Sequence, residues 1–250
     1  MIRMVPVFIG LVLGVVFLVG CEKREMHVKT VSVSASTIYC RFDPSCAVNS
    51  TDSSTTPIPM QAGGTALLHS RTFAGKPGTP ASGLYGYEYR LDLEKASETM
   101  VEVEGVATKR RPCLLTMSLE FGPIVDTLDY DGDGKAGDLV YVVTSGGPGT
   151  IRPGAVHRWR NKLIVNFDTP VCVGPPGDQG HSSYLFGLAS TQPPTSVEAT
   201  VKETAGLAAA PVKYEQYPRA SKLEQYPYYN VPALAPRTNT APEPEGSENR

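Results

Sequence analysis

The chain has 250 residues, 23 Lys and Arg against 25 Asp and Glu, a formal net charge of −2, and 41% hydrophobic residues. The near balance of charge excludes binding to nucleic acid through a general basic surplus, and the apolar content excludes a wholly disordered chain. The 24 glycines and 22 prolines favour a fold with many turns and few long helices.

Residues 1–20 are predicted to be a targeting segment. A single basic residue, Arg3, precedes an apolar run from Met4 to Val19. As a helix this run would be about 24 Å long, which is short for a bilayer core of roughly 30 Å. Its length suits the hydrophobic part of a secretory signal, which is removed from the mature protein. The alternative is an uncleaved membrane anchor with an incidental cysteine.

The segment ends in Leu18-Val19-Gly20-Cys21, which resembles the lipobox of bacterial lipoproteins, the mark of a type II signal peptide. The resemblance implies cleavage before Cys21, a diacylglycerol on its sulfur, and acylation of the new amino terminus by a chain such as palmitate. Two or more acyl chains hold a protein stably at a membrane. We therefore expect a cell-envelope protein anchored by lipid at Cys21. By analogy with the family, Glu22 favours the outer membrane, at its periplasmic face or at the cell surface.

Four further cysteines agree with export. An even number of cysteines in an exported chain indicates disulfides, with three possible pairings. A turn-forming Asp43-Pro44 pair lies between Cys40 and Cys46 and favours their pairing, with Cys113 bonded to Cys172. The alternative, a zinc site, has little support because the chain has no CxxC pair.

Residues 21–29 are predicted to be a charged tether, and residues 30–204 a single domain built from strands. The most regular segment, 84–93, alternates and sends three tyrosines and two leucines to one face. Residues 163–165 are continuously apolar, which predicts a strand buried on both faces. The segments expected to be strands are 30–34, 37–42, 65–70, 84–93, 100–104, 114–121, 139–144, 162–167, 184–189 and 196–201.

No window of eleven or more residues has a convincing helical period. Some ten short strands separated by glycine-rich and proline-rich turns predict one antiparallel β-sandwich or barrel-like domain. The interior is expected around 84–93, 114–121, 139–143, 163–167 and 184–188. Residues 84–90 and 184–190 also resemble strands of exported bacterial β-sandwich domains that have no assigned function, and this resemblance implies the fold alone.

Residues 205–250 are rich in proline and tyrosine and are predicted to be a disordered tail. The tail contains a duplication, KYEQYP at 213–218 and KLEQYP at 222–227, which suits an extended, polyproline-like conformation. Two interpretations stay open. The tail is either a passive solvated extension or a short linear element whose tyrosines dock on a partner or on the domain.

Residues 129–138, DYDGDGKAGD, carry the clearest chemistry. Alternate acidic residues followed by glycine resemble the opening of an EF-hand-type calcium loop and the DxDxDG loops that precede strands in integrin-like (FG-GAP) repeats. Calcium takes six to eight oxygen ligands. The expected ligands are the side chains of Asp129, Asp131 and Asp133, the carbonyl of Lys135, and the carboxylate of Asp138.

The loop departs from both patterns. Val140 stands where an EF-hand has its closing Glu, and the closing Asp138 comes one residue later than in the repeat loops. The motif occurs once, so it does not imply a propeller. The alternative is an acidic Asp-Gly hairpin turn without an ion. A calcium ion here is expected to be structural.

Two functions follow from these observations. The first is a lipid-anchored binding or scaffolding module of the cell envelope, whose partners are the membrane and an envelope protein or glycan. The second is a hydrolase of envelope polymers or glycans with paired carboxylates, for instance Glu88 or Asp92. Binding is favoured because the sequence offers cation ligands but no recognisable nucleophile and base. Two basic patches, at 109–111 and around Trp159, are expected to be hairpin tips, with contact to lipid headgroups or an anionic glycan as the alternative.

Overall fold

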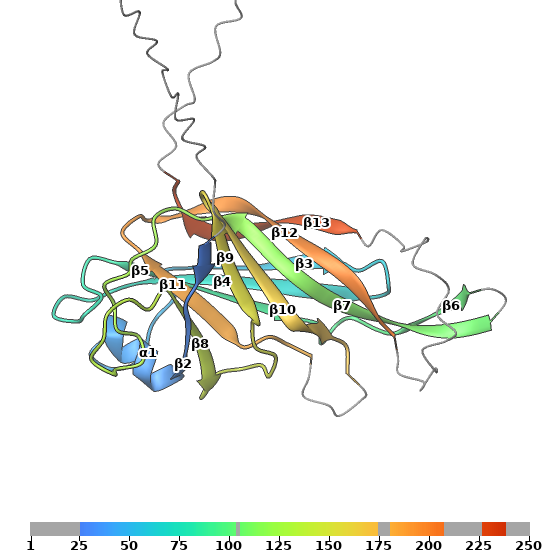
Figure 1. Cartoon of the computed structure of the whole chain (residues 1–250), viewed down its shortest axis with the longest axis horizontal. Helices are drawn as coiled ribbons and strands as arrows, with labels where there is room; N and C mark the ends of the chain where they lie inside the picture. Colours follow the sequence, from blue (N-terminus) through green and yellow to red (C-terminus); the bar gives the residue numbers. More distant parts are fainter. Residues whose placement is uncertain (1–25, 104–105, 175–180, 208–226, 239–250) are drawn as a thin grey trace, which may run out of the picture.

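The computed structural model describes residues 26–103, 106–174, 181–207 and 227–238. Two β-sheets pack face to face, so the chain is a mainly β sandwich, as expected (Figure 1). Residues 1–20, the lipobox with Cys21, and the duplication up to residue 226 lie outside the described residues.

The larger sheet, sheet A, has the strand order β1-β9-β10-β7-β12-β13, and β6 also pairs with β7. All of these pairs are antiparallel. Its strands are β1 Met26–Val28, β6 Thr99–Val103, β7 Val106–Glu120, β9 Ala155–Trp159, β10 Lys162–Cys172, β12 Pro194–Leu207 and β13 Tyr228–Pro236.

The smaller sheet, sheet B, has the strand order β2-β8-β11-β5-β4-β3. The pair of β2 with β8 is parallel and the others are antiparallel. Its strands are β2 Thr30–Ser34, β3 Asp52–Pro59, β4 Thr65–Ala74, β5 Tyr85–Asp92, β8 Val140–Ser145 and β11 Leu185–Ser190.

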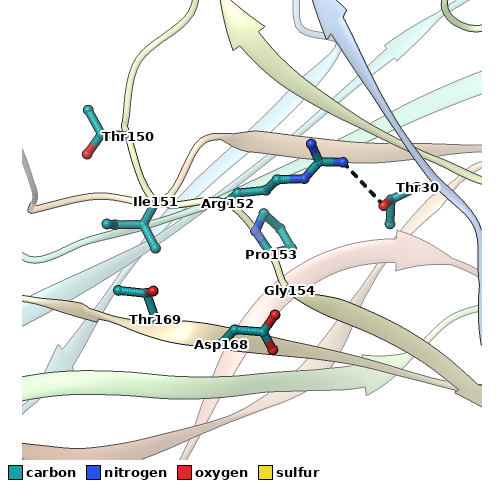
Figure 2. Close-up of a pocket in the computed structure, with 8 residues that line it drawn as sticks. All are labelled: Thr30, Thr150, Ile151, Arg152, Pro153, Gly154, Asp168 and Thr169. Carbon is teal, nitrogen blue, oxygen red and sulfur yellow. Dashed lines mark hydrogen bonds between the residues drawn. The ribbon is translucent and has the colours of Figure 1, made fainter.

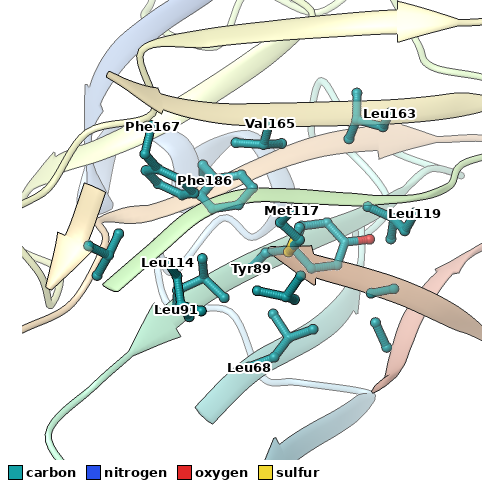
Figure 3. Packing of buried hydrophobic residues seen from close by; sticks show 14 of the residues in the cluster. Leu68, Tyr89, Leu91, Leu114, Met117, Leu119, Leu163, Val165, Phe167 and Phe186 are labelled. Carbon is teal, nitrogen blue, oxygen red and sulfur yellow. The ribbon is translucent and has the colours of Figure 1, made fainter. Parts of the chain in front are cut away.

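The main core lies between the sheets, where the sequence predicted it (Figure 3). Alternation along β5 turns Tyr87, Tyr89 and Leu91 inward, and all three are fully buried. The expectation that residues 163–165 form a strand buried on both faces is wrong. Ile164 on β10 is only half-buried between the buried Leu163 and Val165, because β10 packs on the core through one face of sheet A.

The expected strand at 37–42 is also wrong, because the chain forms a helix there, α1 Ala35–Phe42. Ser34 caps it, and its Oγ accepts a hydrogen bond from the Thr37 backbone N–H at 3.0 Å. Ile38 and Phe42, four residues apart on one helical face, are fully buried. Eight residues are too few to show a helical period in sequence, and the packing partner of this face is distant in the chain.

That partner is the outer face of sheet B. A second core forms there, in which the Phe42 ring packs edge-on to Phe73 at 4.9 Å. Gly86 lies beneath this contact, and a Cβ at that position would overlap the Phe73 ring. Sheet B is therefore buried on both faces where α1 covers it.

Both expected disulfides are present. Cys113–Cys172 joins β7 to β10 at a position where the two residues are also register partners. Cys40–Cys46 links the last turn of α1 to the turn that follows it.

Part of the expected tail belongs to the domain. Residues 228–236 form β13, an edge strand of sheet A that buries Val231, Ala233 and Ala235 in the main core. It also reaches sheet B, because the Tyr89 hydroxyl donates to the Leu234 carbonyl at 2.6 Å. The domain thus extends beyond the predicted boundary at residue 204.

Truncation should separate this strand from the residues after it. A chain ending at residue 207 keeps β12, loses β13 and leaves the buried Tyr89 hydroxyl without its acceptor, which alone costs about 1–3 kcal/mol. A chain ending at residue 238 keeps every described contact. We expect the first to lower the midpoint of denaturant unfolding strongly and the second to leave it unchanged. Equal midpoints for the two chains would show that β13 does not stabilise the domain.

Candidate functional site

Three carboxylates of the 129–138 loop come together. Ligand oxygens of Asp129, Asp131 and Asp138 all lie within 4.8 Å of one another. Asp138 is buried, Asp129 is half-buried and Asp131 is exposed, so the group opens to solvent on one side. This cluster could hold a metal ion, and its oxygen donors suit a hard cation.

Tyr130 anchors the loop between two of these carboxylates. Its ring is fully buried in the second core, edge-on to Tyr141 at 5.0 Å. Its hydroxyl oxygen accepts a hydrogen bond from the Ala189 backbone N–H of β11 at 2.9 Å. Since Tyr130 is fixed to sheet B, the side chains of Asp129 and Asp131 are held on either side of it.

Local hydrogen bonds shape the loop around Asp129. Its carboxylate accepts from the backbone N–H groups of Gly132 at 2.6 Å and Gly134 at 2.9 Å. Both glycines have φ of +84°, a conformation that other residues rarely adopt. Burial acts to raise the pKa of Asp129, but these two N–H groups and Arg41 hold it below its ordinary value. Each carboxylate offers about four lone-pair positions, so acceptor capacity remains for a cation.

Two cations from distant parts of the chain lie against the cluster. Lys29 Nζ is 3.0 Å from Asp138 Oδ1, and this hydrogen bond raises the pKa of Lys29. Arg41 of α1 places Nη2 3.7 Å from Asp129 Oδ2, while its buried Nε has no hydrogen-bond partner among the residues that the structure describes. A bound metal ion would therefore share Asp129 and Asp138 with existing positive charges.

The fourth expected carboxylate, Asp133, is placed differently, and the carbonyl ligand expected from Lys135 stays a prediction. Asp133 Oδ2 pairs with Lys135 Nζ at 2.8 Å, and this contact lowers the pKa of Asp133. Asp133 is not among the three converging carboxylates, and the Lys135 side chain is largely exposed. The structure thus brings together three of the four expected carboxylates.

A second polar site lies beside α1, on the outer face of sheet B. Glu88 of β5 is fully buried, and burial raises its pKa. Arg71 Nε donates to Glu88 Oε2 at 2.7 Å, and the Tyr141 hydroxyl donates to Oε1 at 3.2 Å. Arg71 also donates to the Tyr39 hydroxyl of α1 at 2.6 Å. Both carboxylate oxygens of Glu88 are therefore satisfied within the protein.

A glycine makes this network possible. Gly187 of β11 is the register partner of Glu88, and a Cβ there would overlap the Tyr141 hydroxyl and the Tyr87 carbonyl oxygen. With hydrogen in its place, the Tyr141 ring can cross the strand and reach Glu88.

A row of polar side chains continues across the same face. The Thr55 hydroxyl lies 3.1 Å from His69 Nδ1, and His69 Nε2 is 3.6 Å from Asp92 Oδ2. Burial, followed by the charge of Arg90, lowers the pKa of His69. A small pocket of about 120 Å³ lies between this row and Glu88.

Glu88 and Asp92, each a candidate acid in the hydrolase alternative, do not form a pair with each other. Glu88 and Asp92 are four residues apart on β5, which places them about 13 Å apart along a strand. Paired acids in glycoside hydrolysis are separated by about 5–9.5 Å. Asp92 is in addition paired with Arg90 at 2.8 Å.

A larger polar pocket, of about 490 Å³, lies where the segment after β8 meets β2 and β10 (Figure 2). Arg152 reaches over to β2, and its guanidinium donates to the Ser32 hydroxyl at 2.6 Å. Asp168 lines the pocket from β10, where the register with β7 shifts, and its carboxylate lies next to Gly154 (Figure 2). The lining residues are Thr30, Thr150, Ile151, Arg152, Pro153, Gly154, Asp168 and Thr169.

Sequence reasoning missed several of the residues that build these sites. The buried position of Tyr130 could have been predicted, because an aromatic residue inside an acidic run is unusual for a solvated turn. The contacts of Lys29, Arg41 and Arg71 could not, since their partners lie far along the chain.

None of the residues that the structure describes forms a helix long and apolar enough to cross a bilayer. In comparisons with known proteins, no family model, curated protein or solved structure matches this chain.

Replacing Arg71 should destabilise the domain through Glu88. In Arg71→Met the buried carboxyl loses its cationic partner, and such a loss typically costs about 3–5 kcal/mol. The pKa of Glu88 should then rise further above its ordinary value of 4.5. Because the folded state would bind the proton more tightly than the unfolded state, the variant should lose stability as pH rises through and above that value. Denaturant unfolding at several pH values measures both effects.

The double variant Arg71→Met/Glu88→Gln serves as the control. It removes the buried charge and keeps a hydrogen-bonding group near Tyr141. It should therefore recover part of the stability and lose the pH dependence that is specific to Arg71→Met. If both variants behave alike at every pH, the Glu88 charge is not what Arg71 compensates.

Proposed function

We propose that this chain is a lipid-anchored binding or scaffolding module of the bacterial cell envelope, with a structural calcium ion bracing the 129–138 loop. The anchor is Cys21, and the outer membrane is the proposed location. The observation that carries the proposal is the convergence of Asp129, Asp131 and Asp138 to within 4.8 Å.

Three features support calcium over other cations. The cluster consists of carboxylates, which suit a hard cation, and contains neither His nor Cys. The loop is open on one side, where backbone carbonyls or water can complete six to eight ligands. Extracellular calcium modules bind with dissociation constants of about 10⁻⁴–10⁻³ M, which tolerates the nearby Lys29 and Arg41.

The two disulfides support export. Structural disulfides form and persist in oxidising compartments such as the periplasm and the cell surface. Cys40–Cys46 and Cys113–Cys172 both form in the fold. They agree with the interpretation of residues 1–20 as a secretory signal and with acylation at Cys21.

The pocket around Arg152 and Asp168 supports a binding role. It offers one positive group, one negative group and the hydroxyls of Thr30, Thr150 and Thr169 in about 490 Å³. A concave site with a few polar groups suits a small portion of a polar partner, such as an envelope glycan or a loop of an envelope protein.

Calcium should stabilise the folded chain. At about 100 times the dissociation constant a ligand adds roughly 2.7 kcal/mol, which raises the melting temperature of a domain of this size by about 5–10 °C. Asp131→Asn should abolish most of this rise, because Asp131 is the exposed member of the cluster and its loss disturbs little packing. Thermal unfolding with calcium and with a chelator measures the effect.

Asp126→Asn is the matched control, since Asp126 is an exposed acid in the same connection and lies outside the cluster. It should leave the calcium-dependent rise intact. A melting temperature that chelation leaves unchanged, or an equal loss in the two variants, contradicts the proposed site.

The anchor has its own test. Intact-mass analysis of the chain purified from bacterial membranes should show a mature protein that begins at Cys21 and carries a diacylglycerol and an amide-linked acyl chain. In detergent phase separation it should enter the detergent phase. A mature chain that begins at Met1 and carries no acyl mass would contradict the proposed anchor. That result would not bear on the calcium site, which the melting experiment tests.

A further inference from the structure

The hairpin between β9 and β10 carries an exposed aromatic side chain at its tip. Trp159, the chain's single tryptophan, is 43% exposed and ends β9. Arg160 follows at φ +56°, a conformation usually left to glycine, and its guanidinium lies over the Trp159 ring at 5.3 Å. Left-handed backbone at a bulky residue costs energy and is found more often at functional positions.

Met26 lies beside this tip. It opens β1, is the register partner of Arg158, and is 56% exposed. Met26 and Trp159 are two of the four large apolar side chains that the described residues expose, the others being Met100 and Tyr228. We call the corner of sheet A where β1 begins, the β9–β10 hairpin turns and β13 ends the N-terminal corner; its exposed residues include Met26, Trp159, Arg160 and Arg237.

Hydrogen bonds from Arg158 and from the backbone hold the hairpin tip in place. Arg158 Nε donates to the Arg160 carbonyl at 2.9 Å, and its Nη2 donates to the Gly122 carbonyl at 3.0 Å. The Asn161 carbonyl accepts from the Phe121 backbone N–H at 2.6 Å. The Trp159–Arg160 pair is therefore presented on a fixed turn.

The corner is cationic as well as apolar. Arg160 and Arg237 are both exposed. The backbone of Arg237 lies at Gly122, where a Cβ would overlap the Arg237 carbonyl, so Arg237 stands next to the segment that Arg158 braces. The nearest cation on β10, Lys162, is instead the register partner of Glu120 and does not add to the group.

The corner also lies where the proposed anchor enters the domain. Cys21 precedes Met26 by five residues, and five residues span at most about 17 Å. Lipid chains at Cys21 would therefore keep Met26 within that distance of the bilayer surface. A polar glycan or a protein partner has no such reason to meet this corner.

We propose that the N-terminal corner lies against the anionic headgroups of the membrane and fixes the orientation of the domain there. Tryptophan favours the membrane–water interface, and arginine near the surface is attracted to anionic lipid. This inference rests on the proposed anchor, which sets the distance but not the orientation.

Trp159 makes the contact directly observable, because no other tryptophan contributes to the emission. The lipidated chain is reconstituted into vesicles of phosphatidylglycerol and phosphatidylethanolamine, and into vesicles of phosphatidylcholine alone. With the anionic lipid, the emission should shift to shorter wavelength and be quenched by a spin label placed at shallow depth. With the neutral lipid, both effects should be smaller.

Arg160→Glu should abolish most of the shift and the quenching while the chain still floats with the vesicles. Lys95→Glu, the same charge change on an exposed lysine of the β5–β6 turn, should alter neither. Melting temperatures of both variants establish that each is folded.

The results distinguish this inference from the anchor. The chain could float with anionic vesicles while its Trp159 emission matches that with neutral vesicles and resists quenching. This result contradicts the contact of the N-terminal corner with the headgroups and leaves the anchor intact. A Trp159 emission that responds to an added anionic glycan and not to lipid contradicts that contact as well. A chain that lacks acyl mass and does not float contradicts the anchor itself.

Discussion

The second core, on the outer face of sheet B, holds the acidic loop and the buried Glu88 network in place. Phe42 packs on Phe73 at 4.9 Å and fixes α1, while Tyr130 packs on Tyr141 at 5.0 Å and fixes the acidic loop. Gly86 and Gly187 leave room on the sheet for Phe73 and Tyr141. Because Tyr141 also donates to Glu88, the aromatic packing and the buried charge support one another.

Two nearby cations offset part of the negative charge of the acidic cluster without a metal ion. Lys29 pairs with Asp138, and Arg41 lies near Asp129, so the three carboxylates do not repel one another without relief. A cation gains less by binding such a group than by binding bare carboxylates. Such a cluster is expected to bind calcium weakly, so that it fills only where calcium is abundant.

Local patterns predicted much of the fold, and distant contacts decided the rest. Alternation identified β5 and its core residues because period two is a property of the strand itself. Residues 35–42 became a helix because their apolar face meets Phe73, and residues 228–236 became a strand although they contain two prolines, which edge positions tolerate. In the acidic loop, spacing found three converging carboxylates, whereas the pairing of Asp133 with Lys135 depends on side-chain directions that spacing does not give.

The N-terminal strands connect the proposed anchor to both sheets. β1 pairs with β9 at one edge of sheet A, and β2 pairs with β8 at one edge of sheet B. Lys29, between them, holds Asp138 of the acidic loop. The predicted tether, residues 21–29, reaches too far, because Met26–Val28 already belong to β1. A force on the chain before Met26 therefore acts on two edge strands, each paired with a single neighbour. Contact of Trp159 and Arg160 with the bilayer would give the domain a second attachment, through the β9–β10 hairpin. Forces on the anchored domain would then not act on the three residues of β1 alone.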